Sequence, residues 1–193
     1  RLARDILNLQ LPAGTTSDGA GTKSVQAYQE YIAGVQALNR FEIVPAKRHF
    51  ERALERDTVF ALAHYKWAIA SLYDVAGWRA RWDKTDPIAD IGTPDATVED
   101  PASIRHATAA ARLSGSLPGR ERTLIAGLVA LISHDNARAC DAYGSLVRAD
   151  SSDVEALYGL GECLYSDDVV EPVRGDTMRL QFRSSWSSAL RAF

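Results

Sequence analysis

The stretch AYQEYIAGVQALNR, residues 27–40, followed by AKRHFERALERD, residues 46–57, decides the fold of this 193-residue chain. Gly34 lies in the middle of the first segment and Phe50 in the middle of the second, each within a run of helical periodicity. Glycine inside a helix costs about 1 kcal/mol relative to alanine, so its presence here needs a packing reason. We expect Gly34 to allow close helix approach, with an aromatic ring filling the space beside the contact. The stretch therefore predicts a pair of antiparallel helices.

The same pattern returns at a fixed spacing along the chain. Ala68 lies thirty-four residues after Gly34, and Gly161 lies thirty-four residues after Gly127. The second half of the unit recurs as well, because Tyr143 follows Gly127 at the same distance that separates Gly34 from its aromatic partner. A constant period of this length is typical of helical repeats, in which each unit is a helix pair that packs on its neighbours.

Two breaks in the period locate insertions. Residues 68 and 127 are separated by fifty-nine positions, which is twenty-five more than one period. Four repeats fit at about residues 27–60, 61–119, 120–153 and 154–193, with insertions at 74–100 and 167–176, and the last helix is expected from 177 to 193. Residues 1–23 precede the repeats and predict a short amphipathic helix over 1–11 and then a flexible, Gly- and Ser-rich linker.

Short polar residues mark where several of these helices begin. Ser24 precedes the first repeat helix, Asp135 or Asn136 precedes a later one, and Asp153 opens the fourth repeat. Such side chains accept hydrogen bonds from the free N–H groups of a first helical turn, so we expect them to act as N-caps.

Together these segments resemble the tetratricopeptide (TPR) repeats of bacterial multidomain signalling proteins. The segments that carry the resemblance are residues 27–70, RLSGSLPGRERTLIAG at 112–127 and DSSDVEALYGLGECLY at 150–165. The resemblance is strongest to repeats attached to serine/threonine protein kinases or to transcriptional regulators. It implies an all-α, right-handed solenoid of about four helix pairs over residues 24–193. The chain contains no HRD or DFG kinase motif, so we expect it to be a fragment whose catalytic domain, if any, lies outside it.

In the TPR family the first helices of successive repeats line a concave groove that binds a peptide or a partner protein. By the thirty-four-residue register the candidate groove residues are Tyr28, Tyr31, Tyr65, Leu72, Leu124, Leu128, Tyr158, Glu162 and Tyr165. Tyrosine offers a large contact area with a polar end, which suits a binding surface. The alternative for each ring is that it packs against the next helix. If the groove interpretation holds, replacing Tyr65 and Tyr158 by alanine should weaken partner binding without unfolding the chain.

The function predicted from these features is a non-catalytic protein–protein interaction scaffold without a cofactor. The alternative is a sensor for a small ligand or sugar, with the two insertions acting as a lid. An enzyme is disfavoured because the four histidines fall on separate predicted helices without the spacing of metal ligands. The net charge of −3 argues against nucleic acid as the main partner. We find no apolar run of about 20 residues, the length required to insert a helix across a membrane.

Two further expectations concern the later repeats. Cys140 and Cys163 fall on neighbouring predicted helices; this arrangement permits a disulfide, but two buried free thiols are the preferred interpretation. The last predicted helix carries Phe182, Trp186 and Phe193, so an apolar end could pair two copies into a homo-oligomer.

Overall fold

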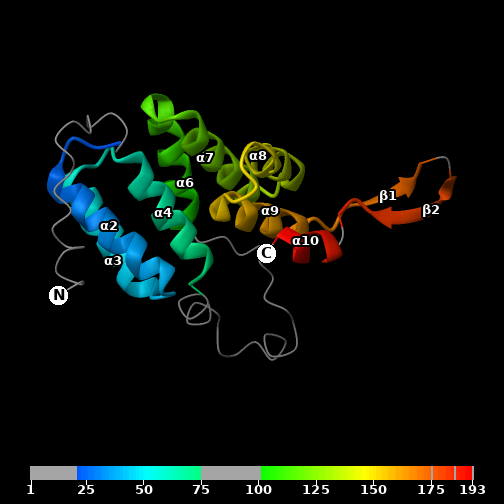
Figure 1. Ribbon diagram of the computed structural model, residues 1–193, viewed down its shortest axis with the longest axis horizontal. Helices are drawn as coiled ribbons and strands as arrows, with labels where there is room; N and C mark the ends of the chain where they lie inside the picture. The colour runs from blue at the N-terminus through cyan, green and yellow to red at the C-terminus, as the bar shows by residue number, and fades with distance from the viewer. Residues whose placement is uncertain (1–20, 75–100, 175, 185, 193) are drawn as a thin grey trace.

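The computed structural model describes residues 21–74, 101–174, 176–184 and 186–192, most of which are α-helical (Figure 1). The elements of this part of the chain are α2 (Val25–Asn39), α3 (Ile43–Arg56), α4 (Ala61–Leu72), α6 (Pro101–Leu113), the 3-10 helix η1 (Ser114–Ser116), α7 (Gly119–Ile132), α8 (Asn136–Ala149), α9 (Val154–Ser166), β1 (Val170–Val173), β2 (Asp176–Phe182) and α10 (Trp186–Ala192). The prediction of a mainly helical fold is confirmed, and one small antiparallel sheet is added to it.

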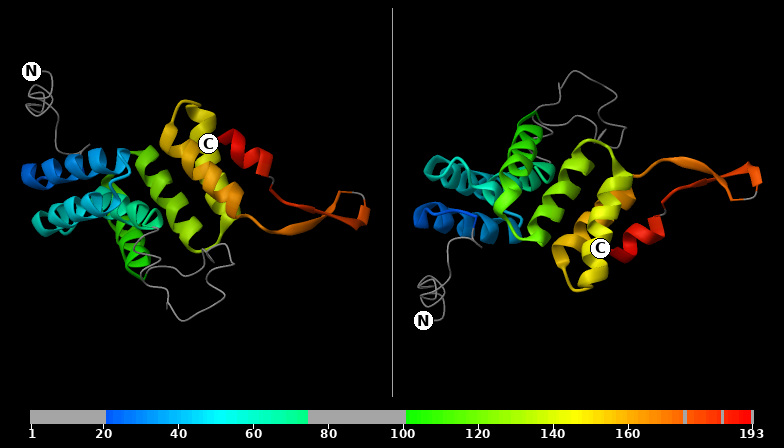
Figure 2. Two further views of the ribbon diagram at one scale, coloured as in Figure 1. Left: turned by 90° about the horizontal axis from the view of Figure 1, so that it is seen from below. Right: turned by 90° about the horizontal axis from the view of Figure 1, so that it is seen from above.

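The helices are stacked in chain order. Each helix packs on the next one, and α2, α4, α7 and α9 also contact one another in turn (Figures 1 and 2). Among the described residues, no contact of similar extent joins α3 to α6 or α6 to α8. The row formed by α2, α4, α7 and α9 is therefore the more closely packed side of the array, and we call the side chains that converge there the inner face.

Glycine–aromatic contacts hold successive helices together, as the sequence predicts. A Cβ atom placed on Gly34 would lie 2.5 Å from Cε1 of Phe50, so α2 and α3 approach each other only because that atom is missing. A Cβ atom on Gly127 would lie 2.8 Å from Cζ of Tyr143, which repeats the same contact between α7 and α8. Gly159 of α9 also lies against the Tyr143 ring, because a Cβ atom placed on Gly159 would lie 2.4 Å from Cε1 of Tyr143. One buried tyrosine thus spaces three helices.

Three helices begin at the N-caps that the sequence predicts. The side chains of Ser24, Asp135 and Asp153 each accept a hydrogen bond from the backbone N–H three residues later, at 3.2, 3.2 and 3.1 Å. Each such cap contributes about 1 kcal/mol to helix stability.

The two cysteines form a disulfide that joins α8 to α9. Cys140 and Cys163 are bonded, with Cα atoms 5.5 Å apart, so the preferred expectation of free thiols is wrong. Sequence periodicity placed them on neighbouring helices, but their distance depends on how closely α8 approaches α9. The small residues along that contact, Gly159 among them, bring the two backbones within bonding range.

A β-hairpin forms in the fourth repeat, where the sequence predicts an insertion at 167–176 followed by the first residues of the last helix. The helix expected from residue 177 does not form, because β2 covers Asp176–Phe182 and α10 begins at Trp186. Apolar and polar residues alternate from Met178 to Phe182, and this two-residue period favours a strand. The hairpin projects away from the helices (Figures 1 and 2), with Met178, Leu180 and Phe182 exposed. Ala189 of α10 is buried.

Several expectations lie outside the described residues. They are the amphipathic helix over 1–11, the linker as far as residue 20, most of the insertion at 74–100, and the contribution of Phe193 to an apolar end.

Candidate functional site

The structure divides the nine predicted groove residues into three groups by exposure. Tyr65, Leu124 and Leu128 are almost fully buried, with 2 % or less of each residue accessible to solvent. Tyr28, Tyr31 and Glu162 are partly buried, while Leu72, Tyr158 and Tyr165 are exposed. Only the last two groups offer surface to a partner in this conformation.

Tyr65, Leu124 and Leu128 belong to the largest hydrophobic cluster of the described chain, which α4, α6, α7, α8 and α9 share. Removing the Tyr65 ring would leave a cavity that typically costs about 3–5 kcal/mol for a large aromatic side chain. A Tyr65→Ala substitution is therefore expected to lower stability as well as to change the inner face, because the Tyr65 ring is part of the core. The physical reason is the tight inner row, which buries positions that would line an open groove in a wider array.

The tyrosines of α2 pack mainly on the neighbouring helices. The ring centroid of Tyr31 lies 5.0 Å from that of Phe60 and 6.0 Å from that of Phe50, and Tyr28 stacks at 6.2 Å from Tyr31. Burial raises the pKa of the Tyr31 hydroxyl well above its ordinary value, with the Glu155 carboxylate as a second cause. For these two rings, packing accounts for most of their contacts.

Charged side chains close the inner face near the start of α9. Lys66 of α4 pairs with Glu155 of α9 at 2.5 Å from Nζ to Oε1. Arg120 of α7 donates two hydrogen bonds to the Asp153 carboxylate, at 2.7 and 2.8 Å, and reaches Glu155 at 3.5 Å. The hydrogen bonds from Arg120 hold the pKa of Asp153 below its ordinary value. These pairs link three helices of the inner row.

A second polar group lies nearer the C-terminal ends of α4 and α9. The rings of Tyr73 and Tyr158 meet edge to face, with centroids 5.4 Å apart and planes at 89°. Glu162 lies one helical turn after Tyr158 on α9, so its carboxylate is on the same face as that ring. Burial raises the pKa of Glu162 above its ordinary value. Leu72 and Tyr165 are exposed on the same two helices, so this part of the inner face combines apolar surface with a partly buried carboxylate.

Two histidines that sequence reasoning left apart meet between α4 and α6. Nδ1 of His64 lies 2.9 Å from Nδ1 of His106, and the His106 ring stacks on Trp67 at 4.1 Å between centroids. The Lys47 ammonium group also lies over the Trp67 ring, with Nζ 4.5 Å from the ring centroid. Burial lowers the pKa of His64, which favours its neutral form. The described residues contain no group of three or more His, Cys, Asp or Glu side chains able to hold a metal ion.

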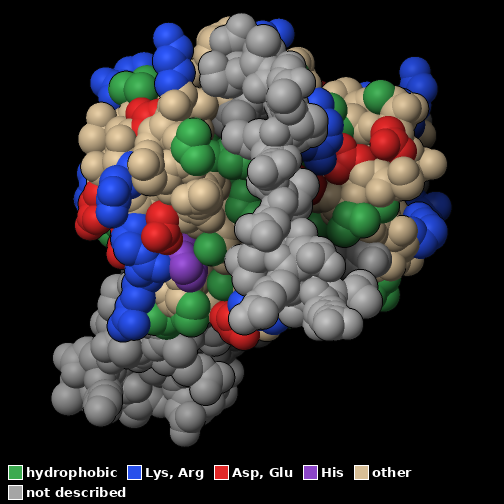
Figure 3. Space-filling model, turned by 60° about the vertical axis from the view of Figure 1, so that its left-hand side comes forward, with side chains coloured by type: hydrophobic (Ala, Val, Ile, Leu, Met, Phe, Trp, Pro, Cys, Tyr) green, Lys and Arg blue, Asp and Glu red, His purple; other side chains and the backbone are tan. Residues whose placement is uncertain are grey.

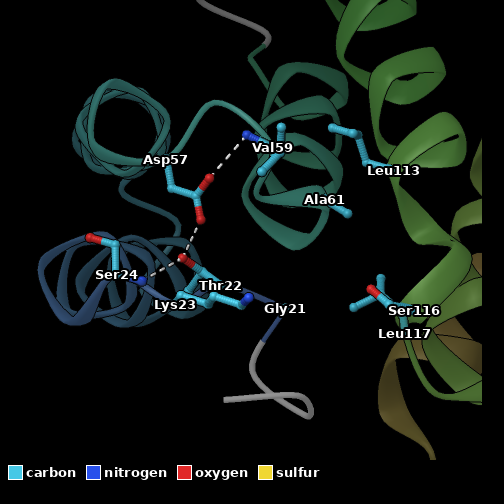
Figure 4. A pocket seen from close by; sticks show the side chains of 10 residues that line it. All are labelled: Gly21, Thr22, Lys23, Ser24, Asp57, Val59, Ala61, Leu113, Ser116 and Leu117. Atoms are coloured by element: carbon cyan, nitrogen blue, oxygen red, sulfur yellow. Dashed lines mark hydrogen bonds between the residues drawn. The ribbon is translucent and has the colours of Figure 1, made fainter.

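A pocket of about 680 Å³ lies away from the inner row, between the segment before α2, the α3–α4 turn and η1 (Figure 4). Asp57 organises its polar wall: one carboxylate oxygen accepts from the Val59 N–H at 3.1 Å and the other from the Thr22 hydroxyl. Leu113 and Leu117 form part of the opposite wall. The hydrogen bonds within the polar wall already engage both Asp57 oxygens.

The charged surface is mixed in sign. The face shown in Figure 3 carries basic and acidic side chains next to one another, with hydrophobic side chains in small groups among them. Pairs such as Arg52 with Glu30 at 2.9 Å and Lys47 with Asp74 at 3.1 Å show how opposite charges are matched. The pattern agrees with the small net charge of −3.

Comparison with protein-family models, with curated proteins and with solved structures found no match. Among the described helices, none is both long enough and apolar enough to cross a membrane. The arrangement of the described residues therefore has to carry the functional argument.

Proposed function

We propose that the chain is a tetratricopeptide-repeat module that binds a peptide or a partner protein through its inner face and catalyses no reaction itself. The repeat assignment is supported by the thirty-four-residue period together with the matching contacts of Gly34 on Phe50 and of Gly127 on Tyr143. It is also supported by the order of the helices, since the first helices of the predicted repeats, α2, α4, α7 and α9, form one continuous row.

The observation that carries the proposal is the exposed surface formed by the C-terminal end of α4 and by one face of α9. Leu72, Tyr158 and Tyr165 expose 44, 37 and 52 % of their area, although they lie on the row whose other side chains are largely packed away. Aromatic and large aliphatic side chains that remain exposed beside a buried polar group are typical of binding surfaces. The resemblance to repeats of bacterial signalling proteins extends the proposal to a scaffold role within a larger protein of that kind.

The absence of catalysis is proposed from the way the charged groups are used. Glu155 and Asp153 are engaged by Lys66 and Arg120, and the His64–His106 pair is packed on Trp67. A general acid or base needs access to a substrate proton, and these groups are committed to contacts between helices.

A displayed library of random peptides, selected on the immobilised chain, tests the proposal. Selected peptides should bind in solution and should lose at least tenfold in affinity when Tyr158 is replaced by alanine, measured by fluorescence anisotropy. Phe41→Ala is the matched control, because Phe41 is an exposed aromatic residue that belongs to the α2–α3 turn and not to α4 or α9. Equal loss in both variants, or no selectable peptide at all, would reject the inner face as a binding surface.

A further inference from the structure

Glu162 is one of the partly buried carboxylates to which the described part of the chain brings no lysine, arginine or histidine nitrogen within 4 Å. Glu30, Asp74, Asp153 and Glu155 each lie within 3.1 Å of a lysine, arginine or histidine nitrogen. For Glu162, the ion pairs of the described residues include no cationic side chain, and the neighbouring ring on its face of α9 is that of Tyr158, four residues earlier. Burying an ionised carboxylate without a positive partner is costly, so this site gains from any cation that enters it.

The surroundings of Glu162 suit a cation in a second way. Tyr73 and Tyr158 present two rings at 89° to each other, so a group placed beside them can meet ring faces from two directions. The negative face of an aromatic ring attracts ammonium and guanidinium groups, and the attraction grows when water is partly excluded. The edge-to-face contact joins Tyr73 to Tyr158, and Glu162 lies one helical turn after Tyr158 on α9, so the two rings and the carboxylate share one part of the surface.

We propose that Tyr73, Tyr158 and Glu162 form a binding site for a lysine or arginine side chain of the partner peptide. This inference rests on the proposed function and specifies the chemistry of the partner. The carboxylate supplies the opposite charge, the two rings supply cation–π contacts, and the exposed Leu72 and Tyr165 contact the apolar residues that flank the cation.

The flanking surface assigns the cation to a peptide rather than to a free small amine. Leu72 belongs to α4 and Tyr165 lies seven residues after Tyr158 on α9, about two helical turns along the same face. Surface of that extent contacts more atoms than a single amine carries, so much of the binding energy is expected from the residues beside the cation.

The test uses peptides selected from the displayed library, each paired with an analogue in which one lysine is replaced by norleucine or one arginine by citrulline. Norleucine keeps the aliphatic part of lysine without its ammonium group, and citrulline keeps the shape of arginine without its charge. Peptides bound at the inner face should contain lysine or arginine, and the neutral analogue should bind about 10- to 100-fold more weakly, as expected for a hydrogen bond to a charged group.

Glu162→Gln is the decisive variant, because it keeps the shape and a hydrogen-bond acceptor while removing the charge. This substitution should weaken binding of the charged peptide by a similar factor and leave the affinity for the neutral analogue unchanged. Glu55→Gln removes the same charge from an exposed position on α3 and serves as the control. Tyr158→Phe keeps the aromatic ring, so it should reduce the affinity for the charged peptide less than Tyr158→Leu does. Circular dichroism and urea unfolding check that each variant is folded.

The outcomes separate the two proposals. If peptides bind at the inner face but Glu162→Gln and the neutral analogues have no effect, the cation site is refuted while the binding function stands. If no peptide is bound, both are refuted. If N-acetyl-lysine amide alone binds as tightly as the intact peptides, the assignment to a peptide side chain is refuted in favour of a small amine.

Discussion

Replacement of Gly159 by alanine sets two effects on stability against each other. Alanine is the better helix former, by about 1 kcal/mol inside a helix. The new methyl group, however, would lie 2.4, 2.5 and 2.6 Å from three atoms of the Tyr143 ring, well inside van der Waals contact. Either the ring or α9 must move if the substitution is to be accommodated.

The surroundings of Tyr143 decide which effect dominates. The ring is buried, and Gly127 lies against it as well, where a Cβ atom would be 2.8 Å from Cζ. A ring held between two helices has little room to retreat, so the cost falls in the upper part of the range of about 1–3 kcal/mol for overpacking. After the gain in helix propensity we expect a net loss of about 1–2 kcal/mol, which lowers the melting temperature by about 3–6 °C in a chain of this size.

The assay is urea unfolding followed by circular dichroism at 222 nm, with Gly144→Ala as the matched control. Gly144 is also a buried helical glycine, but a Cβ atom there meets the flexible end of Arg148 at 3.2 Å. That variant should be neutral or stabilised by up to about 1 kcal/mol. Equal stabilisation of both variants would show that Tyr143 does not space the helices as described. A smaller effect of Gly159→Ala when Tyr143 is already leucine would demonstrate the coupling directly.

Three further predictions concern the disulfide, one ion pair and the hairpin. Replacing Cys140 and Cys163 by alanine should lower the free energy of unfolding by about 3 kcal/mol, as expected for opening a loop of this length. The substitution should also abolish the effect of a reductant on the urea midpoint. A midpoint equal to that of the oxidised chain would contradict this prediction. Asp153→Asn keeps a capping side chain but loses the charge paired with Arg120, so it should cost up to about 1 kcal/mol at pH 7, since Arg120 is 43 % exposed. Because the folded-state pKa of Asp153 is lowered from 3.8, this contribution is present above that value and is lost as the pH falls through the folded-state pKa; a pH-independent difference in the urea midpoint would refute it. Leu180→Ser should shift the urea midpoint by less than about 0.5 kcal/mol, because its side chain is exposed on the projecting hairpin, and a larger loss would show that the hairpin supports the helices.

Sequence periodicity predicted the helices well because helix pairs are local structures. Ser24 and Asp153 were identified as caps, and Gly34 and Gly127 were assigned their packing role from spacing alone. All of these features depend on residues within one repeat or on the next helix, where a fixed period translates directly into contact.

The sequence did not predict features that depend on the exact distance between two helices or on a local change from helical to strand periodicity. The Cys140–Cys163 bond needs the exact approach of α8 to α9, and the His64–His106 contact joins residues forty-two positions apart across the insertion. The hairpin did carry a signal, since its residues alternate in polarity around Leu180. That signal was masked by extending the repeat pattern through an inserted segment.

Tyr31, Tyr65 and Tyr158 occupy the same position in three repeats, yet only Tyr158 is exposed. Tyr31 packs against Phe50 and Phe60, and Tyr65 belongs to the largest hydrophobic cluster of the described chain. Lys66 also pairs with Glu155 and so joins α4 to α9 across eighty-nine residues. Repeat register identifies the side chains that face inward, but the curvature of the row decides which of them stay accessible. Curvature in turn depends on such side-chain pairs between repeats, which no single period describes. A partner is therefore expected at the surface that Leu72, Tyr158 and Tyr165 expose on α4 and α9.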